Sequence, residues 1–310
     1  MSAMTVGILG GGRWGFALAR AAQMAGNRAV VCTRRDTSDR PEGVEVTGEV
    51  HVLGARATLI ILAVPSNVAR PVATTLGDST TGAHYVVHAV RGLSSEGLLP
   101  ISAVVRQETP VKRVGALAGP VLAQDLLEGR PSVIAVASHY PEVIDSVKHA
   151  IASPSLRVSS SDDIIGTEWA SALVGALLVG VGFARELGVS EPLIAGLMVR
   201  ALREAASMGV AAGGLEKTFY GLAGIGDLMA AMAQQDARPE VAFGQRIARG
   251  AKSSQLAVEM GVRIEPIDLV PRVVNFAKQR GLKTPVFETL AAVIEGKGDV
   301  HEITAALMRS

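Results

Sequence analysis

The chain has 310 residues, of which 48% are hydrophobic and 19% charged, a composition typical of a folded protein with room for two domains. Its formal net charge is +1 and it has no run of basic residues, which argues against binding to nucleic acid. Cys32 is the single cysteine, which excludes a disulfide within one chain and a thiolate-rich metal site and agrees with a cytoplasmic protein.

The N-terminal residues do not read as a secretory signal. No positively charged leader precedes the first apolar run, which opens a glycine motif instead of ending at a cleavage site. The longest apolar stretch, residues 169–184, is shorter than the ~20 residues of a membrane span. We therefore predict that this stretch is a buried core helix and that the chain has no membrane insertion.

The first half of the chain alternates short β-type segments with helical or loop segments. Six runs are apolar and rich in β-branched residues: TVGILG, RAVVCT, ATLIILAVP, HYVVHAV, VKRVGALAG and PSVIAVAS. Because these runs are continuously apolar, they are predicted to be strands of a parallel sheet covered on both faces. A helix is predicted over 140–152, before the short run LRVSS.

From about Asp162 onward the pattern changes to long helical segments. Glycine and proline interrupt these segments at LGVSEP, MGVAAGG, GLAGIGD and RGLKTP. The sequence therefore predicts two domains, a βα domain over residues 1–160 and an all-helical domain over 161–310.

The segment TVGILGGGRWGFALARAAQMAGNRAVVCTRR predicts a strand, a turn, a helix and a second strand. Within it Gly10, Gly12 and Gly15 fit the pattern G-x-G-x-x-G. The first glycine permits the tight turn, the second admits a pyrophosphate close to the backbone, and the third lets the helix pack on the strand. The fold class is thus α/β, with an N-terminal Rossmann-type dinucleotide-binding domain followed by an all-helical C-terminal domain.

The end of the second strand bears on the choice between NAD and NADP. An acid there would bind the ribose hydroxyls of NAD, but the position falls near Thr33, and Asp36 comes slightly too late. Arg34 and Arg35 follow Thr33, and two arginines there are suited to a 2′-phosphate, which favours NADP over NAD. The alternative is that both arginines belong to a solvated turn.

The chain resembles the bacterial NAD(P)-dependent glycerol-3-phosphate dehydrogenases over nearly its whole length. The stretches that carry the resemblance are GILGGGRWGFALA, ILAVPSNVAR, HAVRGL, LAGPVLAQDLLEGRPSVIAVAS, SSDDIIGTEWASAL, TFYGLAGIGDL and GLKTPVFETLAAVIEG. The resemblance implies an N-terminal dinucleotide-binding domain, a C-terminal helical substrate domain, and hydride transfer between dihydroxyacetone phosphate and sn-glycerol 3-phosphate.

The cofactor side of the family pattern is largely kept. The resemblance implies cofactor contacts at Gly10, Gly12, Arg13, Trp14, Gly15, Val64, Pro65, Ser66, Ala123 and Glu265. This half of the pattern also has departures, among them a shorter segment before LIILAVP that lacks the family's N-x-x-Y-L-P stretch. Val121 and Leu122 replace a serine and a phenylalanine, and Pro266 and Ile267 follow Glu265 where the family has a Gly-Val pair.

The substrate side departs from the family pattern. The family's catalytic lysine falls on Val174 and the following asparagine on Gly175, while the lysine of its A-T-K-G segment falls on Arg91. An arginine-asparagine pair falls on Pro239 and Glu240, one residue out of register with Arg238. The positions that the resemblance places at the substrate are Gly119, Val174, Gly175, Glu191 and Arg238.

The loss of the lysine matters because hydride reduction of a ketone builds negative charge on its oxygen, which must be stabilised and protonated. Valine does neither. The remaining candidates for catalysis are Arg91, Glu168, Asp227 and His88. The alternatives are that Glu168 and Asp227 cap helices, that Arg91 binds cofactor phosphate, and that His88 is structural. The other histidines, His51, His84, His139, His149 and His301, lack metal-ligand spacing, so no metal is expected.

The sequence therefore predicts an NAD(P)-dependent oxidoreductase of the glycerol-3-phosphate dehydrogenase type acting on a small molecule. Two alternatives stay open: a divergent dehydrogenase or imine reductase for another small substrate, and a dinucleotide-binding protein without turnover. The resemblance also implies a homodimer, for which the apolar helix over 169–184 is a candidate seam, the alternative being an ordinary buried helix.

Overall fold

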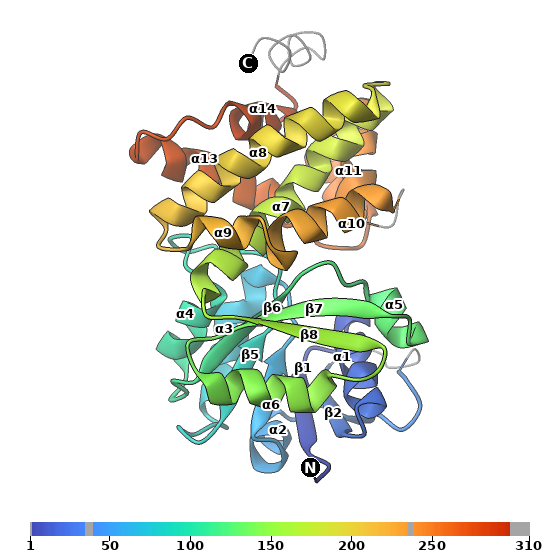
Figure 1. Cartoon of the computed structure of the whole chain (residues 1–310), viewed down its shortest axis with the longest axis vertical. Coiled ribbons are helices and arrows are strands. Elements are labelled where there is room, and N and C mark those ends of the chain that lie inside the picture. The colour runs from blue at the N-terminus through green and yellow to red at the C-terminus, as the bar shows by residue number, and fades with distance from the viewer. Residues whose placement is uncertain (1, 35–39, 235–237, 298–310) are drawn as a thin grey trace. The chain divides into compact units, whose positions relative to one another are not determined.

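The computed structural model of the chain describes residues 2–34, 40–234 and 238–297 (Figure 1). The chain divides into two compact units, Met1–Glu168 and Trp169–Ser310. The sequence placed this division at residue 160, within the last strand of the first unit. The first residues of the long helix that follows belong to the first unit.

The first unit contains one eight-stranded sheet in the order β3-β2-β1-β4-β5-β6-β7-β8. Neighbouring strands are parallel except β6 and β7, which are antiparallel. The wholly parallel sheet predicted from the apolar runs is therefore wrong at this one pair. The strands are β1 (Thr5–Leu9), β2 (Arg28–Cys32), β3 (Glu45–Thr47), β4 (Leu59–Leu62), β5 (Tyr85–His88), β6 (Val114–Ala118), β7 (Ser132–Ala137) and β8 (Leu156–Ser161).

Helices cover both faces of this sheet (Figure 1), which explains why its central strands are apolar along their whole length. The core on one face includes residues of α1, α5 and α6, and the core on the other face includes residues of α2, α3 and α4. The helical segments are α1 (Arg13–Met24), α2 (Val50–Arg56), η1 (Ser66–Val68), α3 (Ala69–Gly77), α4 (Ile101–Glu108), α5 (Ala123–Glu128) and α6 (Pro141–Ile151).

The helix α7 (Ile164–Glu186) contains the apolar stretch 169–184. By length and composition it is sufficient to cross a bilayer, but 89% of its most apolar window is buried inside the protein. This burial is typical of a core helix, as the sequence predicted. It also leaves little of α7 exposed for a seam between two copies of the chain.

The second unit is helical after α7. Its elements are α8 (Glu191–Ala211), α9 (Glu216–Phe219), the π-helical turn η2 (Leu222–Gly226), α10 (Asp227–Ala233), α11 (Pro239–Ala248), α12 (Ser253–Glu259), α13 (Pro266–Gln279) and α14 (Pro285–Ile294). Glu204 joins α8 to α14, because its carboxylate accepts hydrogen bonds from the first-turn N–H groups of Val286 and Phe287 in α14. This buried contact caps α14 from another helix.

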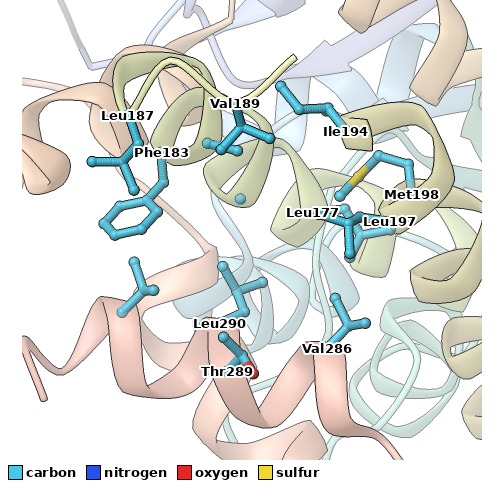
Figure 2. Close-up of a pocket in the computed structure, with 13 residues that line it drawn as sticks. Leu177, Phe183, Leu187, Val189, Ile194, Leu197, Met198, Val286, Thr289 and Leu290 are labelled. Carbon is cyan, nitrogen blue, oxygen red and sulfur yellow. The ribbon is translucent and has the colours of Figure 1, made fainter. Parts of the chain in front are cut away.

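An apolar cavity lies among α7, α8 and α14 (Figure 2). Leu177, Phe183, Met198 and Leu290 are among its lining residues. Thr289 is the one polar side chain of that lining, and its hydroxyl donates to the carbonyl of Pro285 at 2.9 Å. A cavity without a charged group or an available donor does not suit a phosphorylated substrate or a dinucleotide.

Candidate functional site

The glycine loop joins β1 to α1. Gly10 has a φ of +125°, and a Cβ added there would overlap the carbonyl of Ala63. A Cβ added at Gly15 would overlap the carbonyl of Gly10. The Gly10 N–H donates to the carbonyl of Cys32 at 3.0 Å, which ties the loop to the end of β2. These two glycines are therefore required by the packing of the protein itself.

Gly12 differs, because a Cβ added there would meet no described atom within 4 Å. It is the N-cap residue of α1 and supplies no side-chain cap, so the first-turn N–H groups of the helix are left for another acceptor. N–H groups at a helix start, with open space before them, suit the pyrophosphate of a dinucleotide. The residues of this loop therefore fit the predicted cofactor.

The two residues between these glycines have partners of their own. The indole Nε1 of Trp14 donates to the carbonyl of Ala89 at 3.1 Å, which fixes the start of α1 to the residue after β5. The Arg13 guanidinium is exposed and bonds to the side chain of Gln124 in α5. Any cofactor contact of Trp14 would thus use the ring rather than its N–H.

The other predicted cofactor residues of the first unit follow parallel strands. Val64, Pro65 and Ser66 follow β4, with Ser66 buried at the start of η1. Gly119, predicted at the substrate, follows β6, and Ala123 is the first residue of α5. Because β1, β4, β5 and β6 are parallel, these residues leave the same edge of the sheet as the glycine loop. The strand order reverses between β1 and β4, where such sheets bind nucleotides.

His88 and Glu168, two of the four candidates for catalysis, lie together. Both side chains are buried, and His88 Nε2 lies 2.8 Å from Glu168 Oε1, although the ring N–H does not point along that line. Glu168 also accepts from the Ser102 N–H at 2.8 Å and from the Ser102 hydroxyl at 2.6 Å. Glu168 therefore caps the start of α4, which favours the structural alternative for this residue.

Ser102 was not predicted from the sequence. It lies 66 residues before Glu168 along the chain, so no local pattern joins the two. The single local signal is Pro100, which stands at the N-cap position of α4 and marks a helix start. On the other side of the pair, His88 Nδ1 accepts from the Val90 N–H at 3.4 Å, which shapes the turn that leads to the half-buried Arg91.

In the second unit the structure brings Asp227 and Arg238 together. The fully buried Asp227 opens α10 directly after the turn η2, and its Oδ1 lies 2.9 Å from the guanidinium of Arg238. Gly224 makes this turn tight, since a Cβ there would overlap the carbonyl of Phe219. Arg238 is the N-cap residue of α11. The Asp227 carboxylate thus holds Arg238 in place, the arginine that lies one residue before the position expected from the family pattern.

The remaining predicted substrate and cofactor positions of this unit have different surroundings. Val174 and Gly175 are buried within α7. Glu191 is largely exposed and pairs with Arg185 at 2.7 Å. Glu265 precedes α13 and pairs with Arg263 at 3.1 Å.

Two predictions fall outside the described residues, those for Arg35 and His301. Within the described ranges, no three histidine, cysteine, aspartate or glutamate side chains are grouped closely enough to hold a metal ion.

Comparison with known proteins identifies relatives of both halves of the chain. Residues 35–144 match the NAD-dependent glycerol-3-phosphate dehydrogenase N-terminus, and residues 163–305 match the C-terminus of the same family. The glycerol-3-phosphate dehydrogenase (NAD(P)+) of Moorella thermoacetica is 30% identical, covering 98% of this chain and 95% of the relative. That of Fusobacterium nucleatum is 27% identical over 98% of this chain and 96% of the relative.

A solved structure agrees in fold. The glycerol-3-phosphate dehydrogenase of Coxiella burnetii superposes with a TM-score of 0.89 at 22% identity, over 99% of this chain and 98% of that one. At this identity the likeness establishes the fold alone: a mostly parallel sheet with its helices, followed by a helical unit.

Proposed function

The chain belongs to the NAD-dependent glycerol-3-phosphate dehydrogenase family, and from this membership we propose that it interconverts dihydroxyacetone phosphate and sn-glycerol 3-phosphate. It is an NAD(P)-dependent oxidoreductase, since its relatives are enzymes of that class along nearly the whole chain. The observation that carries the proposal is the match to both family regions, 35–144 and 163–305.

The cofactor side of the proposal rests on the glycine loop. The N–H groups at the start of α1 and the open space at Gly12 would hold the pyrophosphate. Val64, Pro65 and Ser66, at the end of β4, would line the nicotinamide. When bound, the dinucleotide donates or accepts the hydride. Arg34, exposed at the end of β2, would bind a 2′-phosphate and favours NADP.

The phosphate of the substrate would bind Arg238. A guanidinium held by a buried carboxylate is oriented before the ligand arrives, and a fork of N–H donors matches a phosphate. Asp227 supplies that carboxylate at 2.9 Å. The negative charge of Asp227 also weakens the attraction of Arg238 for a phosphate dianion. The pair therefore contributes to binding by orienting the guanidinium more than by its net charge.

Arg91 is proposed to take the role of the missing lysine. It follows β5 on the edge of the sheet where the glycine loop and the β4 loop also lie. A guanidinium stabilises the alkoxide that develops on the carbonyl oxygen, but it stays protonated and is a poor proton donor, so the proton would come from water. His88 acts as a positioning residue in this scheme, because its Nδ1 holds the Val90 N–H one residue before Arg91.

One observation favours a second candidate function. Val174 is completely buried within the apolar helix α7, so the chain offers a carbonyl oxygen no ammonium at that place. An imine reductase for another small substrate needs none, since a protonated imine accepts the hydride without an alkoxide forming, and a divergent dehydrogenase would need another group for its carbonyl oxygen. This alternative differs from the first in substrate and keeps the cofactor.

The first test is oxidation of NADH and NADPH by the purified protein with dihydroxyacetone phosphate. Turnover supports the proposal, and turnover only with other carbonyls or imines supports the second candidate. Arg91→Ala is expected to lower kcat at least a hundredfold, as loss of an oxyanion donor does, and Arg91→Lys less. The matched control is Arg106→Ala, which removes an exposed arginine of α4 and should leave kcat unchanged. Equal kcat values for the two alanine variants would contradict the role given to Arg91.

The enzyme is further proposed to be a cytoplasmic homodimer. Because α7 is buried within one chain, the dimer interface would use another surface. Exposed apolar side chains of the second unit include Val199, Val210, Leu215 and Met229. Light scattering after gel filtration gives the mass of the particle, and a mass of one chain would contradict the dimer.

A further inference from the structure

We propose that Glu49 is a specificity-determining residue for the cofactor, whose carboxylate binds the ribose 2′-hydroxyl of NAD and opposes the 2′-phosphate of NADP. The inference deepens the cofactor assignment above and rests on it. The sequence has no acid at the expected position at the end of β2, where Thr33 stands. The structure supplies an acid beside that place from the neighbouring strand.

The register of the edge strands brings Glu49 to this position. β2 and β3 are parallel, with Cys32 opposite Thr47. The pairing continues one residue further, since the Thr33 N–H donates to the carbonyl of Thr47 at 2.9 Å. The segment that leaves β3 therefore leaves the same edge of the sheet as Thr33 and Arg34. Glu49 is the second residue after β3.

The same edge adjoins the glycine loop. A Cβ added at Gly11 would overlap the side chain of Thr33, so these two residues are in direct contact. The Gly10 N–H bonds to the carbonyl of Cys32 at 3.0 Å. In this fold the pyrophosphate lies at the glycine loop and the adenosine ribose lies over the end of the second strand. The residues after β2 and β3 therefore face the ribose position.

Glu49 is held by its backbone while its carboxylate is free to meet a ligand. Its N–H donates to the Thr47 hydroxyl at 3.1 Å, which fixes the turn after β3. Its side chain is 71% exposed, and His51 Nδ1 lies 3.6 Å from Oε2. The carboxylate is thus at the surface, near enough to a single histidine to be neutralised in part if that histidine is protonated.

Two opposite charges act at the end of β2. Burial raises the pKa of the Cys32 thiol, the Glu49 carboxylate raises it further, and Arg34 lowers it. A carboxylate accepts hydrogen bonds from hydroxyls and repels a phosphate, whereas an arginine attracts a phosphate. With both at one place, neither cofactor is excluded, and Glu49 limits the preference for NADP that Arg34 confers.

The test is direct titration of NADH and NADPH into the protein, followed by the fluorescence of the reduced nicotinamide. It compares the unaltered chain with Glu49→Gln, Arg34→Gln and, as matched control, Glu45→Gln. Glu45 opens the same strand, is similarly exposed, and pairs with Arg56 at 2.6 Å. Low salt preserves the interaction of exposed charges.

Glu49→Gln is expected to tighten NADPH binding about fivefold to tenfold, the effect of one exposed charge near a phosphate, and to weaken NADH binding. Arg34→Gln should shift the ratio of the two Kd values the other way, and Glu45→Gln should leave it unchanged. In 0.5 M salt the gain for NADPH should shrink. An unchanged ratio in Glu49→Gln, or one equal to that of Glu45→Gln, would overturn the proposal.

Failure of this inference is separable from failure of the proposed function. Binding is measured without substrate. If the protein binds both dinucleotides but does not reduce dihydroxyacetone phosphate, the proposed substrate is refuted, while the ratio of the Kd values for NADH and NADPH still tests the role of Glu49. If neither dinucleotide binds, the cofactor site and the role of Glu49 are both refuted.

Discussion

Replacing Glu168 by alanine is expected to destabilise the first unit strongly. Its carboxylate accepts two hydrogen bonds from Ser102, at 2.8 and 2.6 Å, and contacts His88 at 2.8 Å, all among buried groups. A buried donor left without an acceptor costs about 1–3 kcal/mol. The Ser102 N–H and the Ser102 hydroxyl both lose their acceptor, and buried His88 loses its neighbouring carboxylate, so the free energy of unfolding should fall by about 3–5 kcal/mol.

Urea unfolding followed by circular dichroism measures this loss, with two variants for calibration. Ser102→Ala removes one hydroxyl and keeps the backbone bond, so it should cost about 1 kcal/mol. Glu186→Ala removes a more exposed carboxylate of the same helix, which pairs with Arg249 at 2.7 Å, and should change the free energy of unfolding far less than Glu168→Ala.

Cofactor binding and kcat, measured at a temperature where Glu168→Ala is still folded, decide between the two roles for this residue. The capping role predicts lost stability with kcat retained in the folded fraction. If Glu168→Ala unfolds at the same urea concentration as the unaltered protein and loses its turnover, Glu168 is catalytic and the reasoning from its hydrogen bonds is wrong.

Four further substitutions test other parts of the structure. Gly12→Ala should keep the unfolding midpoint and weaken NADH binding about tenfold or more. Gly10→Ala should instead lower the free energy of unfolding by about 1–3 kcal/mol or more, the cost of a strained backbone. A stability loss confined to Gly12→Ala would contradict the loop geometry. Burial raises the pKa of Glu204, so the stability of the unaltered protein relative to Glu204→Gln should be greatest below the ordinary glutamate pKa and decline as pH rises through the raised value; paired urea titrations at several pH values check the sign. Asp227→Asn leaves Arg238 without its carboxylate and should lower the free energy of unfolding by about 3 kcal/mol and raise KM for dihydroxyacetone phosphate; an unchanged KM would separate Arg238 from the substrate.

Local patterns in the sequence were sufficient for much of the fold. The helix predicted over 140–152 is α6 (Pro141–Ile151), and the apolar stretch 169–184 lies inside α7 (Ile164–Glu186). The strand-turn-helix around Gly10 and Gly15 was also predictable from the G-x-G-x-x-G pattern, and Gly15 is required by the carbonyl of Gly10 in the same turn. Such features depend on residue periodicity and turn chemistry within a few positions along the chain.

The sequence missed the antiparallel pairing of β6 with β7 and the short edge strand β3 (Glu45–Thr47). An apolar run fixes a strand but not its direction relative to a neighbour. β3 has three residues and is not buried, so it lacks the apolar run by which the other strands were recognised.

By itself the sequence indicated the family and the two-part organisation and predicted that Val174 replaces a lysine, since each of these rests on runs of consecutive residues. The tertiary structure decided which side chains meet: Ser102 with Glu168, and Glu49 beside the end of β2. The physical reason is that helix packing, strand order and strand register bring together residues that are far apart along the chain. Such contacts have no signature in either local segment, and only the folded sheet places the segment after β3 beside the end of β2.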